Sequence, residues 1–145
     1  MSTPLDQLKS VDLSHLSKSE AKEFTLLLEE LEKREKRESS MASFYDFVKT
    51  IWPEFIAGAH HKKMAEAFDK IANGESKRLI INMPPRHTKS EFASYLFPAY
   101  LLGKRPKLKI IEATHTADLA INFGRRVRDL IESDDYAEIF PATQL

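Results

Sequence analysis

Hydrophobic residues recur at helical spacing in the N-terminal part of the chain. Ser17 and Glu20 have the spacing of a capping box, which predicts a helix that begins near Lys18. Phe24, Leu27, Leu28 and Leu31 repeat at helical intervals within it. We expect this helix to fade into the charged run 29–38, because alternating acids and bases are typical of a solvated helix end or linker.

The composition changes near residue 43, where we place a domain boundary. The chain is thus divided into a helical N-terminal extension, 1–43, and a domain, 44–145. A short helix that Trp52-Pro53 ends is predicted to bury one face, formed by Phe44, Phe47, Val48 and Ile51. The next predicted helix covers 60–72, and Gly74 is placed as its C-terminal cap; the inward positions are Met64, Phe68 and Ile71.

Two short apolar runs, 79–81 and 108–113, have the pattern of strands buried on both faces. Between them a helix is predicted to begin near Lys89, to be bent or broken at Pro98 and to end before Gly103. Thr116 can cap a final helix, whose inward positions are Leu119, Phe123, Val127, Leu130 and Ile131. This order predicts an α/β fold with a parallel sheet, and because two strands are too few for a complete sheet, we expect a fragment of a larger domain.

Charge and cysteine content narrow the chemistry. Twenty-two basic and 22 acidic residues give a net charge of +0, which argues neither for nor against a polyanionic partner. The absence of cysteine excludes a disulfide framework, a thiolate metal site and a cysteine nucleophile. No signal-peptide pattern and no apolar run of membrane-spanning length occur, so we expect a soluble, intracellular protein.

The segment 83–90, MPPRHTKS, has the layout of a phosphate-binding loop between a strand and a helix. Lys89 and Ser90 stand where such a loop places its phosphate-binding lysine and its Mg²⁺-binding hydroxyl. Both consensus glycines are absent, since Met83 and Thr88 occupy their positions. Thr88 therefore adopts a conformation that β-branched residues tolerate, or it stores roughly 1–3 kcal/mol of strain. The alternative is a basic turn that precedes a helix.

Several motifs in order resemble the ATPase domain of the large terminase subunit, the DNA-packaging motor of tailed bacteriophages. The resemblance covers about 44–141 and includes PPRHTKS, FPAY at 97–100, GKRP at 103–106, ADLA at 117–120 and the paired Arg125-Arg126. It implies a RecA-like P-loop sheet, incomplete here, and a loop that typically lacks the first glycine. Thr88 departs from the family's usual glycine, which puts turnover in doubt.

The resemblance also implies the site and its ligands, ATP and Mg²⁺. Lys89 and Arg86 would be catalytic, holding and sensing the terminal phosphates, and Ser90 would ligate the metal. The implied nucleotide-binding residues are Pro85, Arg86, His87, Thr88, Lys89, Ser90, His60 and His61. The implied partners are double-stranded viral DNA, the portal protein and the small terminase subunit, with a ring homo-oligomer for the full-length motor, in the host cell cytoplasm.

Other interpretations stay open. No later strand ends in the paired acids of a Walker B motif, and the nuclease domain of the resembling family is absent, so we expect no turnover by this chain alone. The chain could belong to another P-loop ATPase, such as a helicase, or to a non-catalytic phage assembly protein with a vestigial loop. Arg125, Arg126 and Arg128 are interpreted as a solvated helix face, and Asp134-Asp135 as surface turn residues.

Overall fold

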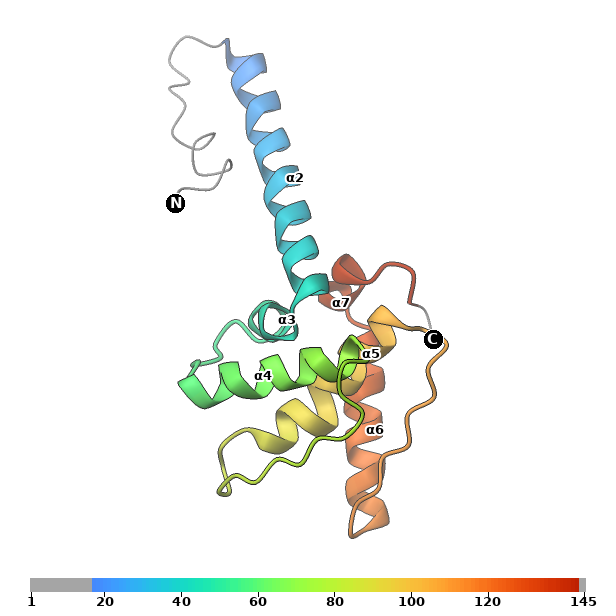
Figure 1. Ribbon diagram of the computed structural model, residues 1–145. Coiled ribbons are helices and arrows are strands. Elements are labelled where there is room, and N and C mark those ends of the chain that lie inside the picture. The colour runs from blue at the N-terminus through green and yellow to red at the C-terminus, as the bar shows by residue number, and fades with distance from the viewer. Residues whose placement is uncertain (1–16, 144–145) are drawn as a thin grey trace. The chain divides into compact units, whose positions relative to one another are not determined.

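The computed structural model describes residues 17–143, and every regular element in that range is a helix (Figure 1). They are α2 (Lys18–Ala42), α3 (Phe44–Ile51), α4 (Ala59–Ala72), the π-helix η1 (Glu91–Leu96), α5 (Phe97–Lys104), α6 (Ala117–Ile131) and α7 (Asp134–Ile139). The chain divides into two compact units between Glu38 and Ser39, inside α2. The sequence placed its boundary near residue 43.

In the first unit, the predicted start of α2 is confirmed. The Ser17 amide donates to the Glu20 carboxylate over 2.9 Å, and the Glu20 amide donates to Ser17 Oγ over 3.3 Å, so the capping box is complete. Residues 29–38 are all helical and exposed, as expected for a solvated helix end. Of the apolar residues that repeat at helical intervals here, Leu27 and Leu31 are 56% and 41% exposed.

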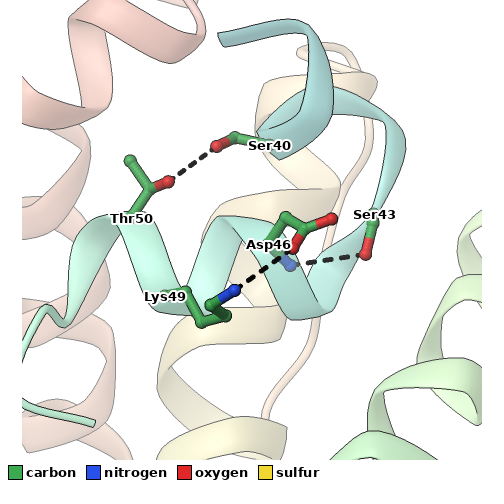
Figure 2. A network of polar contacts seen from close by, with 5 residues as sticks. All are labelled: Ser40, Ser43, Asp46, Lys49 and Thr50. Carbon is green, nitrogen blue, oxygen red and sulfur yellow. Dashed lines mark hydrogen bonds and ion pairs between the residues drawn. The ribbon is translucent and has the colours of Figure 1, made fainter. Parts of the chain in front are cut away.

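Polar contacts connect the last turn of α2 to α3 in the second unit (Figure 2). The buried Ser40 hydroxyl lies 2.8 Å from Thr50 Oγ1. Ser43 is the N-cap of α3, because its hydroxyl accepts a hydrogen bond from the Asp46 amide. The Asp46 carboxylate in turn lies 3.9 Å from Lys49 Nζ. The helix ends at Ile51, before Trp52-Pro53, as predicted.

The core of the second unit is aromatic, and Phe44 lies at its centre. Phe44 and Phe47 are fully buried, as the spacing predicts. Rings from η1, α4 and α5 surround Phe44, with centroid separations of 5.2 Å to Phe68, 5.5 Å to Phe92, 5.4 Å to Phe97 and 5.4 Å to Tyr100. The Phe44 amide donates to Asp69 Oδ1 over 2.9 Å, which satisfies a helix-start donor inside the domain.

α4 and its end follow the sequence prediction closely. The helix buries Met64 and Phe68, while Ile71 is half-buried. Gly74 takes a φ of +80°, and its amide donates to the Ile71 carbonyl. This left-handed position just after the helix is where glycine is favoured, because a side chain there would be strained.

The predicted α/β fold, with its RecA-like parallel sheet, is wrong for the described residues. Neither 79–81 nor 108–113 forms a strand or any other regular element. They are also not buried on both faces: Ile80 is 85% exposed and Ile111 is 94% exposed. A strand requires a neighbour for its amide and carbonyl groups, and a β-branched apolar run does not by itself supply one.

The helix after the 83–90 loop is not broken at Pro98, and it does not end before Gly103 as predicted. It begins at Lys89, widens into the π-helix η1 and continues as α5 to Lys104, past Gly103. The Phe97 amide donates to the carbonyl of Phe92, five residues earlier. Pro98 follows directly in the first turn of α5 and has no amide to donate to the preceding turn. The predicted break is therefore a change of helix type.

α6 and α7 complete the second unit. Thr116 caps α6 by accepting from the Leu119 amide, as predicted. The buried residues of α6 are Phe123, Val127, Leu130 and Ile131, and Leu119 is half-buried. Asp134 and Asp135 are exposed, as expected, but the predicted turn is the first turn of α7. Ser133 caps that helix, and the acidic residues of its first turn interact favourably with the positive end of the helix dipole.

Gly103 is predicted to be required for packing. A Cβ at this position would lie 2.5 Å from Cγ of Phe140, whose ring is buried. We expect Gly103→Ala to lower the free energy of unfolding by about 1–3 kcal/mol, because the ring has to move within a packed core. Chemical denaturation measures the change.

Gly124 provides the matched control, because a Cβ there meets no atom within 4 Å. Gly124→Ala in α6 should stabilise the protein by about 0.4–1 kcal/mol through the unfolded state. Equal effects of the two substitutions would show that Phe140 does not press on Gly103.

None of the helices among residues 17–143 combines the length and apolar character needed to cross a membrane.

Candidate functional site

The 83–90 loop joins an extended segment to the helix that begins at Lys89. Arg86 and Thr88 both have positive φ, at 64° and 55°. The sequence left open whether the Thr88 backbone is strained or adopts a conformation that β-branched residues tolerate. Its φ of 55° is the strained case. Such backbone stores roughly 1–3 kcal/mol per residue and persists only where surrounding contacts hold it. The contacts that hold Thr88 are therefore part of the site.

His61 of α4 holds Thr88 through its ring. The Gly58 amide donates to His61 Nδ1 over 2.9 Å, so in the neutral ring the proton lies on Nε2. His61 Nε2 is 2.6 Å from Thr88 Oγ1 and donates to it. The Thr88 hydroxyl donates onward to the His87 carbonyl over 2.7 Å. These bonds form one chain from the start of α4 to the loop, and each donor has an acceptor.

Aromatic rings enclose His61, which is only 6% exposed. Its ring centroid lies 4.7 Å from that of Phe55 and 5.4 Å from that of Phe92. Burial lowers the pKa of His61 below its ordinary 6.5, and the nearby His60 and His87 lower it further by charge repulsion. The neutral form that the Gly58 bond requires is thus the favoured form.

The other two histidines lie close to this ring. His60 is exposed, and its ring centroid is 3.8 Å from that of His61 and 5.8 Å from that of His87. His87 Nδ1 donates to the exposed Pro85 carbonyl over 2.9 Å. The predicted nucleotide-binding histidines are therefore neighbours in space. Contact of His60 with a nucleobase stays a prediction, whereas both ring nitrogens of His61 are already hydrogen-bonded.

Donors and positive charges are available in the loop. No hydrogen bond among residues 17–143 uses the backbone amides of Arg86, His87 or Thr88. Within the same range, neither Arg86 nor Lys89 forms an ion pair. Arg86 is exposed and Lys89 half-buried at the first turn of its helix. Successive free amides beside cationic side chains are the chemistry that binds an anion.

An open cavity of about 460 Å³ adjoins the loop on the side of α4. Lys89, Ser90 and Ser94 contribute its polar groups. The apolar lining comes from α4, the extended segment and the helix that follows the loop: Phe68, Ile71, Leu79, Ile81, Ala93 and Phe97. The cavity therefore has an apolar body and a charged edge at the two residues predicted to hold phosphate and metal.

A contact that the sequence did not predict fixes the helix after the loop. Arg126 of α6 makes a two-pronged ion pair with Glu91, the residue after Ser90. Its guanidinium carbon lies 4.2 Å from the ring centroid of Tyr95. The bond to Glu91 raises the pKa of Arg126, which keeps its guanidinium charged. Arg126, interpreted from sequence as solvated, instead connects α6 to η1.

The loop fits a phosphate more fully than it fits a metal. Ser90 is exposed, and its hydroxyl makes no hydrogen bond within the described residues, so it can offer one ligand to Mg²⁺. No group of three or more His, Cys, Asp or Glu in residues 17–143 is arranged to hold an ion. Mg²⁺ usually takes one or two protein ligands together with substrate phosphates, which is compatible with a single hydroxyl.

The sequence did not indicate the residues that support the loop, which are Phe55, Gly58, Glu91, Phe92 and Tyr95. It also did not indicate the ion pair between Arg126 and Glu91. His61 and Thr88 are 27 positions apart, and Glu91 and Arg126 are 35 apart, so no local spacing indicates either contact. Comparison of the chain with protein-family models, curated proteins and solved structures found no match.

Proposed function

We propose that the 83–90 loop binds the phosphates of ATP together with Mg²⁺, and that the chain is part of a terminase-like DNA-packaging ATPase. The observation that carries the proposal is the loop itself: three free backbone amides at residues 86–88, with Arg86 and Lys89 beside them. The resemblance of PPRHTKS to the terminase loop supports the choice of nucleotide over another anion. A parallel sheet is no part of this proposal.

In the proposed site, each residue has a role that its chemistry supports. The Lys89 ammonium would neutralise the terminal phosphates, and the planar Arg86 guanidinium would donate hydrogen bonds to their oxygens. The Ser90 hydroxyl would complete the coordination of Mg²⁺. Double-stranded viral DNA, the portal protein and the small terminase subunit are proposed as partners from the resemblance alone, as are a ring homo-oligomer and a place in the host cytoplasm.

Ligand protection tests the proposal. Mg²⁺-ATP at 100 times its dissociation constant should raise the free energy of unfolding by about 2.7 kcal/mol, because only the folded chain binds it. Lys89→Ala should abolish most of this stabilisation. Denaturation with and without nucleotide measures both.

Lys107→Ala is the matched control, since Lys107 is an exposed lysine of the same basic segment outside the loop. It should leave the protection by nucleotide unchanged. An absence of protection in the unmodified chain would favour the alternative, a phage assembly protein with a vestigial loop. Equal loss in both lysine variants would indicate nonspecific attraction between the anion and a basic surface.

A further inference from the structure

The loop has a strained backbone, and one buried side chain contacts it at the strained position. Thr88 has a φ of 55°, which costs a β-branched residue more than most others. Its hydroxyl accepts from His61 and donates to the His87 carbonyl. The backbone of residues 86–88 carries the free amides, so whatever fixes Thr88 also fixes the donors.

We propose that His61 is the positioning residue of the 83–90 loop: its Nε2–H holds Thr88 at positive φ and so keeps the loop amides arranged for phosphate. His61 acts through Thr88 and does not touch the ligand. The nucleotide measurements below rest on the proposed function, whereas the loop measurement does not.

His61 is suited to this task because its own position is fixed. Gly58 binds the other ring nitrogen, and Phe55 and Phe92 lie against the ring. The ring can therefore transmit the position of α4 to the loop. A glycine at this position would adopt positive φ without support, so the threonine creates the need for such a contact.

The first test uses paired substitutions at position 61. His61→Phe keeps an aromatic ring in the aromatic pocket but loses both nitrogens, whereas His61→Gln keeps an N–H that can reach Thr88 Oγ1. We expect His61→Phe to weaken Mg²⁺-ATP binding about tenfold, the usual size of one lost hydrogen bond to a constrained group. His61→Gln should restore most of the affinity.

A second substitution separates positioning from simple packing. In a Thr88→Gly background the loop reaches positive φ unaided, so His61→Phe should then change the affinity less than twofold. If His61→Phe still weakens binding tenfold beside Gly at position 88, the inference is overturned. Calorimetric titration of the four chains measures this coupling.

The pH profile gives a further readout. Protonation of His61 places a hydrogen on Nδ1 and breaks the bond from Gly58, so affinity should fall as the pH drops through the pKa of His61. His60 and His87, the other titratable groups that face this ring, and the phosphate of the nucleotide are the same in the unmodified chain and in His61→Gln. The affinity of the unmodified chain should therefore fall more steeply with falling pH than that of His61→Gln. Identical profiles would contradict the inference.

Trypsin cleavage tests the loop in the absence of nucleotide. The loop exposes Arg86, and the turn that follows α5 exposes Lys107, which serves as an internal reference. His61→Phe should speed cleavage after Arg86 about tenfold while leaving cleavage after Lys107 unchanged. Equal acceleration at both sites would mean general loosening and would overturn the inference. Selective acceleration in a chain that fails to bind ATP would support the positioning role and reject the nucleotide.

Discussion

Phe44→Ala is expected to lower the free energy of unfolding of the second unit by about 3–5 kcal/mol, the usual cost of removing a buried phenylalanine. The side chain is fully buried, and rings from α3, α4, η1 and α5 lie within 6.3 Å of it. No single neighbour can collapse into the space, because each ring also contacts others. Urea denaturation followed by far-ultraviolet circular dichroism measures the loss.

The control for Phe44 also tests the absence of a sheet. Ile80→Ala removes a comparable apolar side chain that is 85% exposed, so it should change the stability by less than about 0.5 kcal/mol. A central strand of a parallel sheet would bury Ile80, and its truncation would then cost about 2–5 kcal/mol. A large effect at Ile80 would therefore contradict the exposed, unpaired segment.

Tyr136→Ala should also destabilise the protein by about 3–5 kcal/mol, because it removes a fully buried ring that joins α7 to α5. The Tyr136 hydroxyl donates to the Ala99 carbonyl over 2.8 Å. Burial raises the pKa of Tyr136, so this donor is retained throughout the neutral range. The ring lies 5.2 Å from Phe140 and 6.2 Å from Phe47, between centroids.

Tyr136→Phe separates the ring from its hydroxyl. We expect it to cost about 1 kcal/mol, the net worth of one buried hydrogen bond. Tyr45→Phe is the matched control, since Tyr45 is only half-buried and its hydroxyl makes no hydrogen bond within the described residues. If Tyr136→Phe costs as little as Tyr45→Phe, the bond to Ala99 contributes nothing to stability. Thermal and urea denaturation of the three variants give the comparison.

Local signals were sufficient for most helices. Ser17 with Glu20, Thr116 and Gly74 act on backbone groups within a few residues, so their effect is visible in the sequence. The spacing of Phe123, Val127 and Leu130 likewise indicated the buried face of α6 correctly. The candidate loop could be located from the Lys89-Ser90 pair, because a lysine and a hydroxyl residue at the predicted start of a helix are also a local feature.

Tertiary contacts decided the rest. The runs 79–81 and 108–113 have strand composition, but pairing depends on a partner that no local pattern supplies, and the described residues provide none. Pro98 was expected to break a helix, and the π turn before it, supported by packing of Phe92 and Phe97, allows the helix to continue. The support of Thr88 by His61 depends on side chains far apart in the chain, and only folding brings those atoms within hydrogen-bonding distance.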